Sequence, residues 1–359
     1  MPMELDFFTP RTLTGVINLR PIKWDLFTGF FKPQDPKPVE VFMLELSLRG
    51  ASILPSITNY DAGTMRKGET LKVDYVKAPR FRPKRAFRAA DLLKTQKGFT
   101  PYDPRINPVE RAIADDMDAH RDDIDRMLEI MCAQAAVDGK IELYDVIEGT
   151  AVKNYTVDFQ RPASHDIKLT GDKLWSNPQS DLLGSVENYG LLIQEDTSGL
   201  SATDLILGKN AWTAFRRHPD VKDTLDNRRI DGGSLSPRVQ SKLKGQWNGL
   251  NIWVHNATYK DINGQTKYYL EPDCALLLAR DAESVIEFGQ PVDVKCEGPA
   301  RIFAKQFEQE DPSGIFTIAE SRPLPITRHT GWTVKLTVLA ASGVSEQSGL
   351  YGGTPLASE

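Results

Sequence analysis

Histidine, serine and carboxylate side chains are the groups in this sequence that could do chemistry, and their spacing decides whether they can act together. The five histidines, His120, His165, His218, His255 and His329, show no HxxxH spacing of a helical metal site. Ser164, His165 and Asp166 are the residue types of a hydrolase triad, but direct neighbours in sequence do not project into the relay geometry. A hydrolase that uses His165 is therefore the weakest of three hypotheses.

The sequence contains neither of the common nucleotide-binding motifs, GxxxxGK[ST] and GxGxxG. Cys132, Cys274 and Cys296 are widely separated and include no CxxC pair, which fits a reducing cytoplasm and offers no disulfide framework. Carboxylates between 115 and 129 could be imagined as a hard-cation site, but a straight helix presents them in a row rather than around an ion. We therefore expect no metal, no cofactor and no catalytic residue.

Charge changes sign abruptly along the chain. Residues 66–97 hold eleven Lys and Arg against three acidic residues, whereas 108–138 hold nine Asp and Glu against three Arg. The predicted contact residues of the basic segment are Lys72, Lys77, Arg80, Arg82, Lys84, Arg85 and Arg88. Two adjacent fields of opposite sign suggest a chain that binds copies of itself.

The acidic segment has the pattern of a long helix. Asn107 suits the N-cap, Pro108 the first helical position, and Gly139 the C-terminal stop. Apolar residues recur at helical spacing from Val109 to Ala135, which predicts one buried face. At ~100° per residue, a carboxylate ridge falls on the opposite face, formed by Asp115, Asp118, Asp122, Asp125 and Glu129. An ordinary solvated face explains the ridge equally well.

Composition places the chain among globular proteins. It has 359 residues, a formal net charge of −5 and 26% charged residues. No run of about 18 apolar residues is present and the first residues lack a signal-peptide pattern, so we expect no membrane contact and no such export. The net charge also argues against a dedicated nucleic-acid binder.

Four collinear blocks carry a resemblance to a known family. They are DFFTPRTLTGVINLRP, LKVDYVKAPRFRPKR, LILGKNAWTAFRRHPDVKDTLDNRR and SRPLPITRHTGWTVKLTVLA. Their order, around a long acidic helix, resembles the major capsid proteins of lambda-type tailed phages, the capsid protein E family. The likeness spans about residues 7 to 340 and rests on the order of the blocks, because no single motif is diagnostic.

The resemblance implies an α+β fold of the Hong Kong 97 type. In it, 1–38 would be an N-terminal arm, 39–106 a strand and extended basic loop, and 107–144 the spine helix of a peripheral domain. Residues 145–325 would be mainly an axial domain with peripheral strands, 326–341 the last peripheral-domain strand, and 342–359 a flexible tail. From the residues alone, the aromatic and Pro-rich arm reads as an extended segment lying across another surface, or as a short helix over 20–31 packed on its own domain.

The same resemblance implies a virion protein that is assembled in the host cytoplasm. Its partners would be copies of itself in hexamers and pentamers, a separate scaffolding protein, a portal, a possible decoration protein, and packaged double-stranded DNA contacted non-specifically. The alternative from another class is a nucleic-acid-binding protein that uses 66–97 as its electrostatic footprint.

Overall fold

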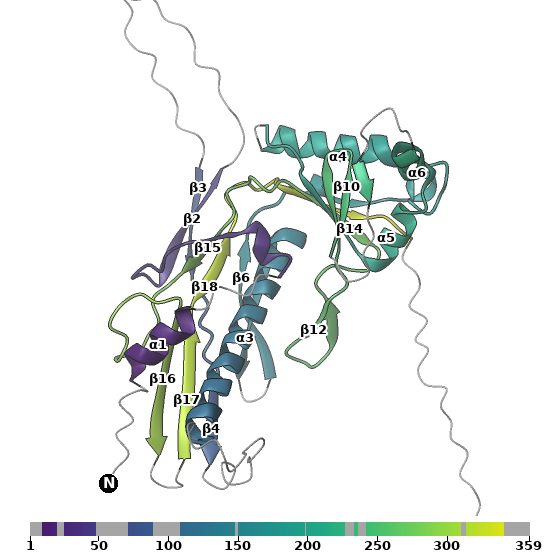
Figure 1. Ribbon diagram of the computed structural model, residues 1–359. Helices are drawn as coiled ribbons and strands as arrows, with labels where there is room; N and C mark the ends of the chain where they lie inside the picture. Colours follow the sequence, from purple (N-terminus) through teal and green to yellow (C-terminus); the bar gives the residue numbers. More distant parts are fainter. Residues whose placement is uncertain are drawn as a thin grey trace, which may run out of the picture.

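The longest helix, α3 (Pro108–Val137), forms the axis of an elongated part of the molecule in the computed structural model (Figure 1). The structure describes residues 9–19, 25–47, 71–88, 108–147, 150–197, 199–226, 233–235, 242–309 and 314–340. The predicted apolar stripe is confirmed, because Ile113, Ile124 and Met131 are all buried. Gly139 takes a φ of 67°, which glycine adopts without strain, and ends the helix.

A three-stranded antiparallel sheet runs along this helix (Figure 1). Its order is β16 (Ile302–Gln309), β17 (Gly314–Ser321) and β4 (Lys84–Arg88). Helix α1 (Pro10–Leu19) contacts β16, and α3 contacts β17, so both helices cover the same face. Leu13, Ile113 and Ala319 belong to the apolar cluster between them.

Smaller pairings complete the elongated part. A hairpin of β5 (Lys140–Ile147) and β6 (Thr150–Asp158) follows α3, and β2 (Val41–Ser47) pairs with β3 (Leu71–Lys77). Another small sheet has the order β1 (Lys32–Pro33), β15 (Val285–Phe288) and β18 (Pro323–Ile326). Part of the basic segment is therefore held by its own chain, since β4 is the edge strand of the three-stranded sheet. Its flanks, 66–70 and 89–97, lie outside the described residues.

A seven-stranded sheet with helices around it forms the second, more compact part (Figure 1). In spatial order its strands are β7 (Asp166–Lys168), β19 (Thr333–Thr337), β14 (Cys274–Leu278), β8 (Asp204–Leu207), β11 (Leu250–Val254), β10 (Leu243–Trp247) and β9 (Gly233–Leu235). Its helices are α4 (Leu182–Asp196), α5 (Lys209–Phe215) and α6 (Pro219–Asp226). Single turns η2 (Thr28–Phe30), η3 (Ala163–His165) and η4 (Gly171–Lys173), and the hairpin β12 (Thr258–Lys260) with β13 (Thr266–Tyr268), complete the elements described.

The last strand differs from its expected position. We expected 326–341 to return to the part that contains the long helix, whereas β19 pairs with β14 and β7 in the seven-stranded sheet. Val334 and Leu336 are completely buried there. Alternation along TVKLTVL indicates a strand, but it does not say which sheet supplies the neighbours. The remaining domain boundaries stay a prediction.

The described residues of the predicted N-terminal arm, 9–19 and 25–38, are only partly extended. Residues 10–19 are helix α1, and the aromatic residues that follow enter the chain's own core: Phe27, Phe30 and Phe31 are all buried. Phe30 lies edge-on to Trp253, and Phe31 to Trp332, so this segment joins α3 to the compact part. The short-helix alternative over 20–31 is correct in its packing; within 25–31, the part of this range that the structure describes, the helical element is the η2 turn, and 20–24 lie outside the described residues.

Candidate interaction surface

Arg80 and Arg82 lie between β3 and β4 and both reach a buried carboxylate on β17. Glu320 is completely buried, and it accepts hydrogen bonds from Arg80 Nε at 2.9 Å and Arg80 Nη2 at 2.8 Å. Arg82 Nη1 is 3.4 Å from the same carboxylate. The hydrogen bond to Glu320 raises the pKa of Arg80. A buried carboxylate therefore fixes two guanidinium groups at the surface.

A second carboxylate extends this arrangement. Asp293 is nearly buried, Arg82 Nη2 is 3.2 Å from it, and the Lys305 ammonium is hydrogen-bonded to it. Burial acts to raise the pKa of Asp293, but the hydrogen bond from Lys305 opposes it and the net shift is downward. Asp293 is thus held ionised among cations.

Lys84 lies beside these cations and is held by contacts with two aromatic rings. Its Nζ lies 4.3 Å from the ring centroid of Phe316 and 5.4 Å from that of Phe307, and the two rings are stacked. Such contacts hold an ammonium group near an apolar surface without neutralising it. We call the following residues the cationic array: Arg80, Arg82, Lys84 and Lys305.

The cationic array lies on the sheet face that α3 does not cover. Thr317 and Ala319 contact the α3 side, so the alternating Ile318 and Glu320 point to the opposite face. An open hollow of about 520 Å³ is present there, lined by Arg82, Lys84, Lys295, Lys305, Phe307 and Ile318. This face can receive an anionic partner.

Three members of this array, Arg80, Arg82 and Lys84, were predicted from the basic segment, but Lys305 and the carboxylates that hold the array were not. Lys295, Lys305, Asp293 and Glu320 lie outside the basic segment. The one available signal was a lone Glu320 in the strand FTIAES, since a carboxylate in a buried strand requires a cationic partner.

Arg85 joins the basic segment to the acidic helix within one chain. Its Nη1 lies 3.1 Å from Asp116, a buried residue that also contacts His120 at 3.1 Å. Burial raises the pKa of Asp116, but hydrogen bonds from His120 and Thr317 outweigh it and the net shift is downward. The described partner of Arg85 is therefore in its own subunit, and Asp116 was not among the predicted ridge residues.

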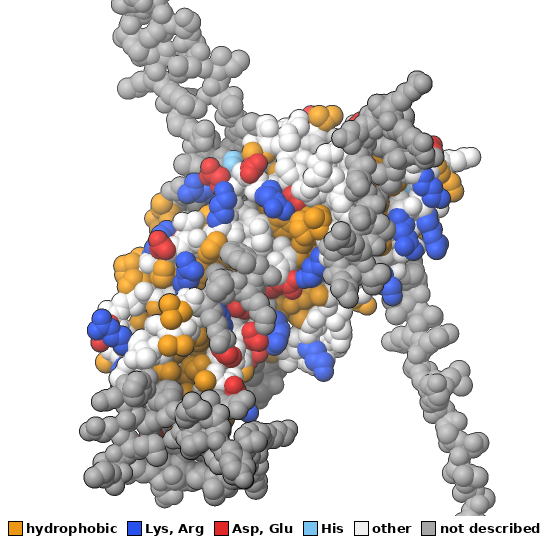
Figure 2. Space-filling view, viewed as in Figure 1, with side chains coloured by type: hydrophobic (Ala, Val, Ile, Leu, Met, Phe, Trp, Pro, Cys, Tyr) orange, Lys and Arg blue, Asp and Glu red, His pale blue; other side chains and the backbone are white. Residues whose placement is uncertain are grey.

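Only some carboxylates of the predicted ridge are exposed to solvent. Asp115 and Asp122 are exposed and Asp118 is half-buried, but Asp125 and Glu129 are buried, so the prediction is wrong for these two. On the face of the elongated part seen in Figure 2, basic, acidic and apolar side chains are interspersed where they are not covered by grey atoms. Helical spacing gives the direction of a side chain, and it cannot show that another segment of the chain covers it.

The covering segment is the one that contains Phe27 and Thr28. Glu129 accepts hydrogen bonds from the Phe27 amide and from the Thr28 amide and hydroxyl, each at 2.8 Å. Burial nevertheless raises the pKa of Glu129. Asp125 lies 3.7 Å from Arg121, which donates to the Ile17 carbonyl of α1 at 2.8 Å. Glu129 directly, and Asp125 through Arg121, therefore help to hold α1 and the η2 turn against α3.

The structure gives less detail for three other predicted contact residues, Lys72, Lys77 and Arg88. Lys77, at the end of β3, lies 3.6 Å from the exposed Glu40. Lys72 is on β3 and Arg88 on β4, and their side chains fall outside the described residues.

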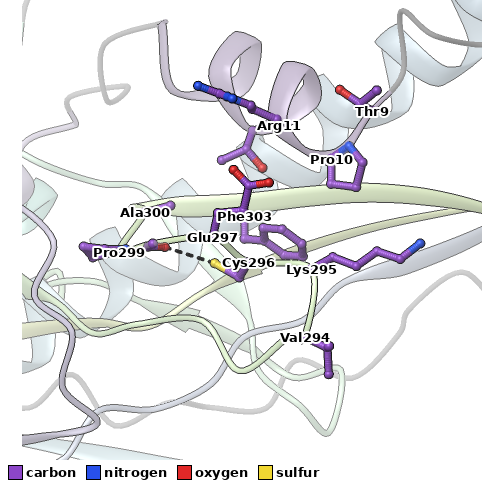
Figure 3. Close-up of a pocket in the computed structure, with 12 residues that line it drawn as sticks. Thr9, Pro10, Arg11, Val294, Lys295, Cys296, Glu297, Pro299, Ala300 and Phe303 are labelled. Atoms are coloured by element: carbon purple, nitrogen blue, oxygen red, sulfur yellow. Dashed lines mark hydrogen bonds between the residues drawn. The ribbon is translucent and has the colours of Figure 1, made fainter.

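A groove lies beside this surface, between α1 and the connection from β15 to β16. Figure 3 shows Pro10 and Arg11 on one side, and Lys295, Cys296 and Phe303 on the other. Its open volume is about 550 Å³. Lys295 lines both this groove and the hollow on the sheet, so the two are adjacent.

The three residues considered for catalysis do not come together: Ser164 and Asp166 are exposed, whereas His165 is packed in the core. His165 is completely buried and lies 2.8 Å from both the Asp196 carboxylate and the Thr333 carbonyl. A substrate has no route to this imidazole from the surface. Within the described part of the chain, no group of three His, Cys, Asp or Glu is placed to hold a metal ion, and no helix is long and apolar enough to cross a membrane.

The chain is similar in sequence and in fold to capsid proteins of phages. The model of a family described as phage major capsid protein E matches residues 9–338. A solved structure assigned as a prophage capsid protein of E. coli CFT073 is 19% identical, with a TM-score of 0.66 over 92% of this chain and 98% of that one. A phage-related protein of Bordetella bronchiseptica RB50 is 14% identical, with a TM-score of 0.50 over 92% and 96%. No curated protein matches the sequence.

Proposed function

Because this chain belongs to the phage major capsid protein E family, we propose that it forms the icosahedral head of a tailed phage around double-stranded DNA. The match to the family over 9–338 carries the proposal. The fold is of the Hong Kong 97 type, as the sequence resemblance implied, and the role of the chain is that of a capsid shell subunit located in the virion.

The finer assignments follow from this role. We propose that the subunits form hexamers and pentamers on a separate scaffolding protein in the host cytoplasm, with a portal at one vertex. The packaged DNA would contact the inner wall non-specifically, and a decoration protein could bind the finished shell. The family is one of structural capsid proteins, which supports a subunit without enzymatic activity.

We further propose that the exposed members of the two charged groups meet between subunits. The cationic array presents partly neutralised cations beside the apolar residues Phe307 and Ile318, a mixed surface that suits a protein partner. Asp115 and Asp122 are exposed carboxylates of the opposite sign on α3. A dedicated nucleic-acid-binding function is not favoured, since the family is one of capsid proteins.

Assembly of the purified protein tests the proposal. We expect shells, tubes or capsomers by negative-stain electron microscopy at raised concentration, alone or with its scaffolding protein, and no enzymatic turnover. A chain that stays monomeric by light scattering under all of these conditions, and that instead retains DNA in a salt-sensitive manner, would overturn it.

A further inference from the structure

We propose that the groove between α1 and residues 294–300 is a docking site for residues 1–8 of the same chain. This goes beyond the role in the shell, because it concerns a contact within one subunit. The occupant is the segment MPMELDFF, which joins the described chain at Thr9. Thr9 itself lines the groove, so the segment enters the site at its rim.

The groove offers apolar surface that the described chain leaves uncovered. Val294 is fully exposed, with a relative accessibility of 105%, although it is an aliphatic residue beside an open depression. Pro10, Pro299 and Ala300 line the same depression (Figure 3). Apolar side chains exposed together at a concave site mark a contact surface.

The chemistry of the segment matches that surface. Residues 1–8 contain two acidic residues, Glu4 and Asp6, and no Lys or Arg, and every other position is Met, Pro, Leu or Phe. Eight residues span at most ~26–29 Å at 3.3–3.6 Å per residue, which is enough to cross a groove of this size. Leu5, Phe7 and Phe8 can therefore reach the apolar lining.

The basic residues of the groove predict the course that the acidic segment 1–8 takes along it. Arg11 and Lys295 line the groove and neither is in a salt bridge with any residue that the structure describes, whereas Glu297 is the one acidic residue in the lining. The Lys84 and Lys305 side chains lie in the adjacent hollow. An acidic segment that enters at Thr9 and passes Lys295 would approach the cationic array with its carboxylates.

Cys296 provides a reporter for this contact. It lines the groove and is partly exposed, whereas the other two cysteines, Cys132 and Cys274, are completely buried. Its Sγ donates to the Gly298 carbonyl at 3.1 Å, and burial raises its pKa. The rate of Cys296 alkylation by a maleimide at mildly alkaline pH therefore measures whether the groove is covered.

The first experiment compares alkylation rates in dilute subunits. We expect deletion of residues 2–8 to increase the Cys296 rate about tenfold, which corresponds to loss of a docking free energy of about 1.4 kcal/mol. Glu4→Lys with Asp6→Lys should increase the rate in the same direction, and Phe7→Ser with Phe8→Ser should do so without altering charge. Glu187→Lys, an exposed acidic residue on α4, is the matched control and should leave the rate unchanged. Equal rates in the wild type and all three variants overturn the proposal.

The second experiment tests proximity and assigns the occupant. In Phe7→Cys, diamide should take two electrons from the introduced thiol and Cys296 and join them in a disulfide within one chain, because such bonds require Cα atoms about 4.4–6.8 Å apart. Addition of Cys296→Ser should abolish the product, and Glu187→Cys, at an exposed position on α4, should give none. Disulfide-linked dimers would overturn docking within the chain and assign the groove to the segment of a second copy. Absence of any disulfide to Cys296 in both Phe7→Cys and Phe8→Cys would also overturn it.

Discussion

Glu129 accepts two hydrogen bonds from Thr28, one from its amide and one from its hydroxyl, both at 2.8 Å. The two residues lie 101 positions apart in the sequence. Glu129 is on α3 and Thr28 begins the η2 turn, so a carboxylate of the predicted acidic face fixes the start of the chain. We expected the carboxylates of this face to contact a neighbouring subunit, but Glu129 already accepts hydrogen bonds from Phe27 and Thr28 of its own chain.

Glu129→Gln should destabilise the isolated subunit by roughly 1–3 kcal/mol, because one of the two amide donors would then face an NH₂ group. Chemical denaturation monitored by tryptophan fluorescence measures the change. Exposed Glu187→Gln on α4 is the control and should be neutral. A neutral result for Glu129→Gln would show that the contact with Phe27 and Thr28 contributes little.

The same residue predicts a dependence on pH. Burial raises the pKa of Glu129 in the folded state, so the folded protein binds its proton more tightly than the unfolded chain. The contribution of Glu129 to stability is therefore fully present below the unfolded pKa, and it is lost as pH rises through the folded pKa. Between acidic and neutral pH, the wild type should lose more unfolding free energy than Glu129→Gln, and parallel curves would contradict this.

Arg80→Ala should destabilise the subunit by roughly 1–3 kcal/mol, since it leaves Glu320 buried with fewer donors. The loss is limited because Arg82 also approaches Glu320 and Arg80 is itself partly exposed. Lys84→Ala is the matched control, because Lys84 contacts aromatic rings rather than a buried carboxylate. Thermal unfolding at several ionic strengths distinguishes the two variants.

Charge reversal tests the contact between subunits. Asp115→Lys with Asp122→Lys should leave the subunit folded and impair assembly, as should Lys84→Glu with Lys295→Glu, because all four residues are exposed. Combining the two reversals should partly restore assembly if the groups meet directly. Light scattering and electron microscopy provide the measurement. Normal assembly of each reversed variant at physiological salt, where screening acts over about 8 Å, would show that these charges are only solvated.

Truncation after Ala341 should preserve cooperative unfolding. The residues removed contain few large apolar groups, whereas β19 ends before them and is buried in its sheet. A truncation before Leu336 is the control, and it should abolish the fold because it removes two completely buried residues, Leu336 and Val338. Broadened thermal unfolding in the first truncation would show that the tail supports the subunit.

The sequence by itself determined two things. The spacing of apolar residues determined where a helix or a strand forms, and the order of four sequence blocks indicated the protein family. The stripe from Val109 to Ala135 determined α3 because helical spacing is a property of neighbouring residues. In the same way, TVKLTVL determined a strand. The long helix and the last strand are present as predicted, and the family assignment is confirmed.

Tertiary structure alone decided which charges are available to a partner. Asp122 and Glu129 lie on the same side of α3 by spacing, yet Asp122 is exposed and Glu129 is covered by residues 101 and 102 positions away. Arg80 and Lys84 are similar in sequence context, yet only Arg80 meets the carboxylate of Glu320, 240 residues distant. The physical reason is that burial depends on contacts between remote segments, whereas sequence periodicity reports only the direction of a side chain from its own helix or strand.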